Sequence, residues 1–162
     1  MNTPTGFRTC RLPVPPDWID YNGHMNVGYY VVAFDRASDA LLDHLDLGEA
    51  YRRRADASVF VVEAHVTYDR EVREGDPLLF ETILLNADAK RLHFIHRMYH
   101  ETEGFLAATN EIMGLHVDLN ARRSAPFPGE VAAGITAMVE AHSGVERPPQ
   151  VGRLIGIPAP RA

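Results

Sequence analysis

The chain has 162 residues, of which 46% are hydrophobic and 23% are charged, and its formal net charge is −6. These values are typical of one globular domain with a core of its own. The acidic balance argues against nucleic acid as the main partner, and no apolar run reaches the roughly 20 residues that span a bilayer. Cys10 is the single cysteine, and the first residues lack the basic and apolar stretches of a leader. We therefore expect a cytoplasmic protein that does not engage membranes.

Residue patterns along the chain predict one strand, one long helix and then a series of strands. A first strand is expected over residues 7–14, and turn-forming residues make 17–26 a loop. From Val27 to about Leu45 apolar residues recur with helical spacing; Asn26 is a suitable N-cap and Gly48 a suitable stop. The remaining expected elements are a short helix at 49–54, strands at 58–68, 77–85, 91–99 and 105–119, and a helix at 129–142.

The links between the four later strands are short and rich in turn formers, which makes successive strands antiparallel neighbours. The long helix is apolar around most of its circumference, and only the later sheet can cover it. We therefore predict an α+β fold in which a curved antiparallel sheet wraps around a long central helix. The domain is expected to span residues 1–144, followed by a proline-rich, irregular tail at 145–162.

The most informative segment is Asp20–Asn26, with the sequence DYNGHMN, directly ahead of the long helix. It places a carboxylate, a glycine turn and a histidine beside a helix N-terminus, which carries unpaired N–H groups and about half a positive charge. A carboxylate facing a carbonyl held at such an end can break an acyl bond. From the residues alone, Asp20 equally fits a turn residue, His24 a side chain that holds the loop, and Asn26 a helix cap.

Five segments occur in a characteristic order: residues 18–26 (WIDYNGHMN), 38–42 (SDALL), 62–66 (VEAHV), 90–93 (KRLH) and 115–118 (LHVD). On these segments the chain resembles the hotdog-fold acyl-CoA thioesterases of the 4-hydroxybenzoyl-CoA thioesterase-like superfamily. Within that superfamily it is most similar to the betainyl-CoA thioesterase branch, whose members occur alone or fused to carnitine dehydrogenase. The resemblance covers roughly residues 7–140.

This resemblance implies hydrolysis of a small acyl-CoA, with betainyl-CoA, cleaved to glycine betaine and CoA, as the first candidate. It implies that Asp20 is the nucleophile or the general base. Backbone amides from Gly23 through His24 to Asn26 would receive the carbonyl oxygen. No metal or organic cofactor is expected apart from the CoA of the substrate. The resemblance also implies a dimer with composite active sites, or a tetramer of such dimers.

Other residues remain open to two interpretations. The rings of Trp18, Tyr21, Tyr29 and Tyr30 either pack the helix start or bind a quaternary ammonium or aromatic acyl group. Glu63 and His65 share one side of a strand. They face either solvent or the cleft, where they would contact the acyl group.

Basic residues are similarly ambiguous. Arg53, within the Arg52–Arg54 cluster, and the pair Lys90 and Arg91 are either solvated or bind CoA phosphates. On a strand, His93 points away from His96 and His100, so these histidines predict no zinc site. Ser38 and Cys10 lack the surroundings of a nucleophile.

Two rival functions are a hydratase or dehydratase of the same fold and a non-catalytic acyl-CoA binding module. Asp20 and His24 are four residues apart with a glycine between them, which fits the hydratase pattern poorly. An intact Asp20 argues against a module without catalysis.

Overall fold

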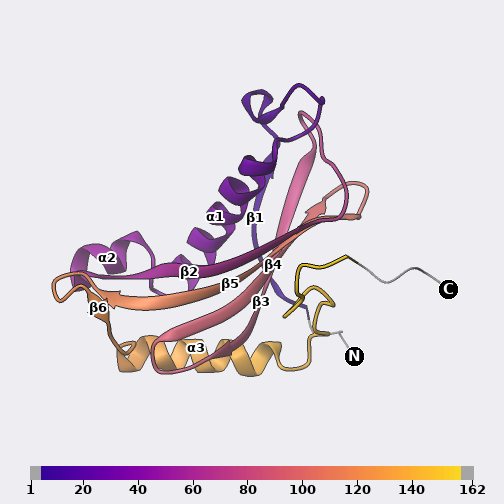
Figure 1. Ribbon diagram of the computed structural model, residues 1–162. Helices are drawn as coiled ribbons and strands as arrows, with labels where there is room; N and C mark the ends of the chain where they lie inside the picture. Colours follow the sequence, from indigo (N-terminus) through magenta and orange to yellow (C-terminus); the bar gives the residue numbers. More distant parts are fainter. Residues whose placement is uncertain (1–4, 158–162) are drawn as a thin grey trace.

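The computed structural model describes residues 5–157 (Figure 1). The chain begins with a strand and a short 3-10 helix, continues with two α-helices, and then builds a sheet that is followed by a last helix. In chain order the elements are β1 (Phe7–Pro13), η1 (Pro16–Trp18), α1 (Val27–His44), α2 (Glu49–Ala55), β2 (Ala57–Tyr68), β3 (Pro77–Ala87), β4 (Arg91–His100), β5 (Leu106–Asp118), β6 (Arg123–Ser124) and α3 (Gly129–His142).

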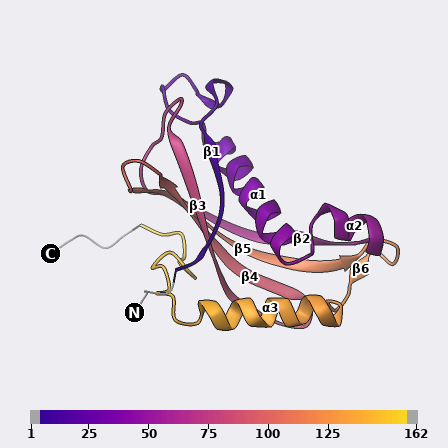
Figure 2. The same ribbon diagram turned by 180° about the vertical axis from the view of Figure 1, so that it is seen from behind.

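The six-stranded sheet has the order β1-β3-β4-β5-β2, with the short β6 paired to β5. All of its strand pairs are antiparallel. The sheet curves around α1, which lies against one of its faces (Figure 2). This arrangement confirms the predicted α+β hotdog fold. η1 and β6 were not expected from the sequence.

Helix α1 begins where the sequence predicted. Asn26 adopts an extended conformation, and its Oδ1 accepts a hydrogen bond from the N–H of Gly28 at 3.0 Å. This is the N-cap interaction. The prediction that Gly48 stops the helix was wrong: α1 ends at His44, the left-handed position is Asp46 with φ of 57°, and Gly48 is the N-cap of α2.

The core lies in two clusters along the helix. Tyr30 and Phe34, in the first half of α1, pack with the sheet residues Phe80 and Met98. Leu41, in the second half, belongs to a cluster that also includes residues of α2 and α3. α3 lies along β3, where the N–H of Leu84 donates to Nδ1 of His142 at 3.0 Å. Both ends of α1 are therefore fixed to the sheet, so the helix start has a defined position.

The segment that follows α3 contains turns but no helix or strand as far as residue 157, and residues 158–162 of the predicted tail lie outside the described part. It crosses the sheet face opposite α1 (Figure 1), where the N–H of Gly152 donates to Oε2 of Glu111 at 2.7 Å. The division into a domain at 1–144 and a tail stays a prediction. Within residues 5–157, no helix combines the length and the apolar character needed to cross a membrane.

Candidate functional site

The segment Asp20–Asn26, here called the motif loop, is a tight turn closed by its own backbone. The N–H of Gly23 donates to the C=O of Asp20 at 3.0 Å, and the N–H of Asp20 donates to the C=O of His24 at 3.1 Å. Gly23 has φ of 79°, a left-handed conformation that favours glycine. The loop is anchored at its end, because the N–H of Asn26 donates to the C=O of Trp18 at 2.9 Å.

The carboxylate of Asp20 lies at the beginning of α1. Its Oδ1 accepts a hydrogen bond from the N–H of Asn22 at 2.8 Å, and its Oδ2 lies 3.4 Å from Nδ2 of Asn26. The side chain is partly buried. Asp20 is thus fixed beside the helix cap while part of its carboxylate still meets solvent.

Several of the backbone amides expected to receive the carbonyl oxygen already have acceptors in the structure. The N–H groups of Gly23, Met25 and Asn26 already donate to backbone carbonyls. Within the described residues, no hydrogen bond is formed by the N–H of His24 or of Val27. Val27 is the first residue of α1, where the helix dipole favours negative charge. The donor that the geometry favours is therefore Val27, which sequence reasoning missed although the predicted cap at Asn26 identifies the next residue as a helix start.

His24 has a local structural contact. Its Nδ1 lies 3.2 Å from the C=O of Met25, within hydrogen-bond reach, and its ring is partly buried. This geometry agrees with the loop-holding interpretation of its side chain.

The four predicted substrate-binding rings separate into three environments. Trp18 is buried and stacks on Tyr29 with centroids 5.3 Å apart and an interplanar angle of 9°. Tyr21 is 98% exposed. Tyr30 is buried and meets Tyr68 edge to face, with centroids 5.1 Å apart. These rings do not form one cage, because Trp18 and Tyr29 pack on each other and Tyr21 points to solvent.

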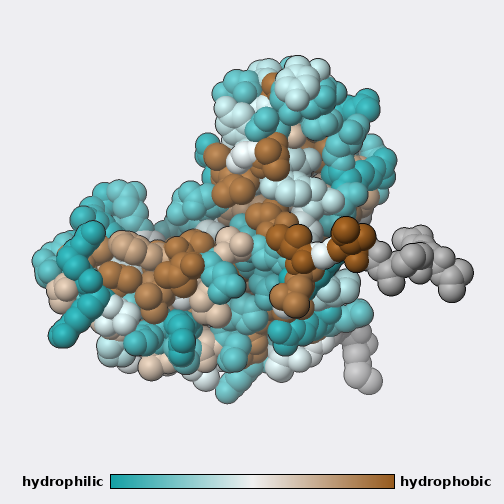
Figure 3. All heavy atoms as spheres, viewed as in Figure 1, coloured by the Kyte–Doolittle hydropathy of each residue, from teal (hydrophilic) through white to brown (hydrophobic). Residues whose placement is uncertain are grey.

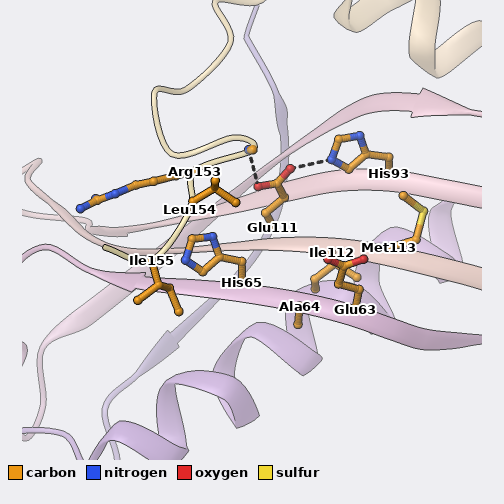
Figure 4. Close-up of a pocket in the computed structure, with 11 residues that line it drawn as sticks. Glu63, Ala64, His65, His93, Glu111, Ile112, Met113, Arg153, Leu154 and Ile155 are labelled. Carbon is orange, nitrogen blue, oxygen red and sulfur yellow. Dashed lines mark hydrogen bonds and ion pairs between the residues drawn. The ribbon is translucent and has the colours of Figure 1, made fainter. Parts of the chain in front are cut away.

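A hollow of about 530 Å³ is lined by the other two predicted substrate residues, Glu63 and His65. Figure 4 shows both on the same sheet face as His93 and Glu111, beneath the segment Gly152–Ile155. Nε2 of His93 lies 2.7 Å from Oε1 of Glu111.

The motif loop does not line this hollow. It borders a different one, which is lined by His24, Met25, Val27, Tyr30, Tyr68, Asp69, Arg70 and Glu71. Within one copy, Glu63 and His65 therefore do not share a hollow with the motif loop, and their role in substrate binding stays a prediction. The period-two pattern places them on one side of β2, but that side faces away from α1.

The candidate CoA ligands differ in how far their charges are already neutralised. Arg91 pairs with Asp88, and Arg53 pairs with Glu49 at 3.0 Å. Nζ of Lys90 donates to the hydroxyl of Ser124 at 3.1 Å, and no ion pair of Lys90 occurs within residues 5–157. Of these three side chains, Lys90 is therefore the one whose positive charge is not neutralised by an ion pair within the described residues.

A serine and a histidine do meet in the fold, beneath α1. Oγ of Ser38 lies 2.9 Å from Nε2 of His96, whose Nδ1 lies 2.6 Å from Oγ1 of Thr82. Burial lowers the pKa of His96 to about 3, so the ring is neutral. Ser38 also donates to the C=O of Phe34 at 3.2 Å. This enclosed network anchors α1 and gives Ser38 the structural role expected of it.

Within residues 5–157, no three His, Cys, Asp or Glu residues form a cluster suited to a metal ion.

The amino-acid sequence was compared with models of known protein families and with curated relatives. The model of the thioesterase-like superfamily matches residues 14–135. The chain belongs to this superfamily. A betainyl-CoA thioesterase of Pseudomonas aeruginosa is 43% identical over 94% of this chain and 96% of its own length. A bifunctional L-carnitine dehydrogenase/betainyl-CoA thioesterase of Rhizobium meliloti is 39% identical over 93% of the chain, which spans 30% of that longer protein.

Solved structures agree with the family assignment. A putative thioesterase of Pseudomonas putida KT2440 is 35% identical, with a TM-score of 0.82 over 95% of this chain and 98% of its own. A Staphylococcus aureus protein in complex with CoA is 28% identical, with a TM-score of 0.87 over 98% of this chain and all of its own. The chain is thus a hotdog-fold thioester hydrolase of the thioesterase-like superfamily, with the motif loop at its helix start.

Proposed function

We propose that this thioesterase-like protein hydrolyses betainyl-CoA to glycine betaine and CoA, with Asp20 as the reacting carboxylate. The observation that carries the proposal is the position of Asp20 at the start of α1: its carboxylate lies 3.4 Å from the cap residue Asn26, and within residues 5–157 the N–H of the next residue, Val27, has no acceptor. The name of the Pseudomonas aeruginosa relative, at 43% identity, supports the choice of acyl group. An acyl thioester is a suitable substrate because its carbonyl develops negative charge as it is attacked.

In the proposed reaction the thioester oxygen accepts a hydrogen bond from the N–H of Val27. Asp20 either attacks the carbonyl carbon, forming an anhydride that water then opens, or removes a proton from the attacking water. In both routes one water molecule is consumed and the C–S bond breaks. The thiolate of CoA takes up a proton, and the acyl group leaves as its free acid. The Asn26 amide keeps the Asp20 carboxylate oriented throughout.

The decisive experiment is Asp20→Asn, assayed by thiol release from betainyl-CoA with a chromogenic disulfide. We expect kcat to fall by at least about 100-fold, the low end for loss of a general base. The matched control is Asp17→Asn, which removes an exposed carboxylate three residues earlier. Unchanged thiol release in Asp20→Asn would refute the role of Asp20. Binding of betainyl-CoA by the wild type without thiol release above the spontaneous rate would favour the non-catalytic binding module. Loss of an enoyl-CoA's conjugated absorbance without thiol release would favour the hydratase.

Lys90 is the proposed ligand of a CoA phosphate. Its ammonium group has no ion-pair partner within residues 5–157, and Lys90 precedes Arg91 at the start of β4. Lys90→Gln should raise KM for acyl-CoA more than it lowers kcat, because a phosphate contact far from the carbonyl is the same in ground and transition states. Arg53→Gln should change KM less, since Arg53 is already paired with Glu49.

A second copy of the chain is the proposed partner of β2. This strand pairs with β5 along one edge, and within the described residues its other edge has no partner. Phe60, Val61 and Val62 are 42%, 55% and 56% exposed, and Figure 3 shows apolar side chains gathered over this part of β2. Two copies of β2 related by a two-fold axis would cover both the apolar side chains and the bare backbone.

Sedimentation equilibrium tests this dimer. The wild type should sediment as a dimer or a tetramer, and Val62→Lys should shift it toward monomer. Ile157→Lys is the control, since Ile157 is 101% exposed and lies outside every helix and strand of the described residues. A monomeric wild type would refute the interface.

A cytoplasmic location, expected from the sequence, stays a prediction.

A further inference from the structure

A hollow of about 240 Å³ adjoins the motif loop, where the end of β2 meets the start of α1. Its walls combine aromatic rings, acidic side chains and the first residue of the helix. It is distinct from the larger hollow on the opposite sheet face, with which it shares no lining residue. Val27, whose N–H is the proposed oxyanion donor, is one of the residues that line this hollow, together with His24 of the motif loop.

Two tyrosines form the aromatic part of the wall. The rings of Tyr30 and Tyr68 stand at 90° with centroids 5.1 Å apart. The hydroxyl of Tyr68 donates to the C=O of Val27 at 3.4 Å, and Tyr30 is held by a hydrogen bond with the backbone of Val72. Tyr68 is 49% exposed, so part of its ring remains open to a ligand. The ring of Tyr68 is thus positioned against the helix start.

The charged part of the wall is predominantly negative. The carboxylate of Asp69 lies 3.3 Å from the hydroxyl of Thr67, and no ion pair of Asp69 occurs within residues 5–157. The one cation of the wall, Arg70, is engaged elsewhere: its guanidinium lies 3.9 Å from the ring centroid of Phe105 and 3.5 Å from Glu103. Asp69 therefore presents a carboxylate charge that no neighbouring cation cancels.

We propose that Tyr68, Tyr30 and Asp69 form the subsite for the quaternary ammonium of the acyl group, an inference that rests on the proposed function. A quaternary ammonium has no N–H to donate, so aromatic faces and a nearby carboxylate are the groups that recognise it. Its nitrogen lies about 2.5 Å from the carbonyl carbon in a betainyl thioester, from ordinary bond lengths. The subsite must therefore adjoin the oxyanion donor, as this hollow does through Val27.

The test compares two thioesters of the same shape. In 3,3-dimethylbutanoyl-CoA a carbon atom replaces the charged nitrogen of betainyl-CoA. The ratio of kcat/KM for betainyl-CoA to that for the neutral thioester isolates recognition of the charge, after the spontaneous hydrolysis of each has been subtracted. Wild type should favour betainyl-CoA. Tyr68→Leu and Asp69→Asn should each lower the ratio by about 3- to 30-fold, the range of one cation–π or charge contact.

Three controls make the outcome decisive. Tyr68→Phe keeps the ring and should keep the ratio, whereas Tyr21→Leu removes a ring that is 98% exposed and should not change it. Circular dichroism verifies that each variant is folded. A wild type that cleaves both thioesters equally, or a Tyr68→Leu variant with the wild-type ratio, overturns the subsite and leaves the thioesterase standing. A wild type that releases no thiol from either thioester overturns the proposed function and the subsite together.

Discussion

Asn26 contacts Asp20 and caps α1 with the same side chain. Its Nδ2 lies 3.4 Å from Oδ2 of Asp20, while its Oδ1 accepts the N–H of Gly28 at 3.0 Å. The group that fixes the helix start thus also orients the candidate catalytic carboxylate. The Asn26 side chain therefore has two roles, capping α1 and orienting Asp20. Substitutions that preserve only one of its two contacts can separate these roles.

Asn26→Ser should retain the cap and lose the contact with Asp20, because a serine hydroxyl also accepts from helix N–H groups. We expect stability within about 0.5 kcal/mol of wild type and a reduced kcat. Asn26→Ala loses both contacts and should in addition cost about 1 kcal/mol of unfolding free energy. Urea unfolding and thiol-release kinetics on the two variants measure the difference. Equal kcat in Asn26→Ser and wild type would show that the Asp20 contact has no catalytic importance.

Val27→Pro deletes the proposed oxyanion donor while preserving the helix. Proline is favoured at the first helical position, and Asn26, with φ of −64° and ψ of 143°, has the conformation that a residue before proline prefers. We expect kcat to fall by about 100- to 1,000-fold, the effect of removing one oxyanion donor.

The control for this substitution is Val27→Ala, which trims the side chain and keeps the N–H. Circular dichroism and thermal unfolding should show that both variants retain α1. A Val27→Pro variant with wild-type kcat would refute the donor role of Val27 and make the N–H of His24, which also has no acceptor within residues 5–157, the next candidate.

Sequence periodicity predicted the elements better than it predicted their contacts. The start of α1 and its cap at Asn26 were correct because local preferences determine them. β2 was also found, but alternation alone left open which face Glu63 and His65 occupy. Its register shift between Val61 and Glu63, and its place at the sheet edge, depend on pairing with distant β5.

Contacts between distant residues account for what the sequence could not predict. Strand alternation predicted that His93 and His96 point in opposite directions, but it could not show that the partner of His96 is Ser38, 58 residues away. Tyr68 and Asp69 carry no motif of their own, and only the fold brings the end of β2 against Val27. The one available signal was Tyr68 at the end of β2 followed by Asp69, and this pair has meaning only beside the helix start.

Burial of His96 predicts a specific dependence of stability on pH. Its pKa is lowered to about 3 in the folded state from 6.5, so below pH 6.5 the unfolded chain binds a proton that the folded chain does not. The unfolding free energy should therefore decrease as pH falls from 7 to 5, with about 2 kcal/mol of the decrease due to His96. Burial lowers the pKa of His142 as well, which adds a change of the same sign.

His96→Gln separates these contributions. Glutamine can donate and accept hydrogen bonds but does not titrate, so the variant should be less stable at pH 7 and should lose less stability on acidification. Urea unfolding of both proteins at pH 7 and pH 5 gives the comparison. The same loss of stability in His96→Gln as in wild type would refute the assignment of the acid sensitivity to His96.

Glu111 should control how tightly the C-terminal segment is held on the outer sheet face. Its Oε2 accepts the N–H of Gly152 at 2.7 Å, and its Oε1 lies 2.7 Å from Nε2 of His93. A hydrogen bond to a charged group contributes about 1.5–3 kcal/mol. Arg153, next to Gly152, is a site for trypsin, so Glu111→Ala should accelerate cleavage there by about 10-fold or more when opening is faster than cleavage.

The control is Glu103→Ala, which removes an exposed carboxylate that makes no contact with this segment. Cleavage at Arg153 in that variant should match wild type. Equal cleavage rates in Glu111→Ala and wild type would refute the role of Glu111 in holding this segment.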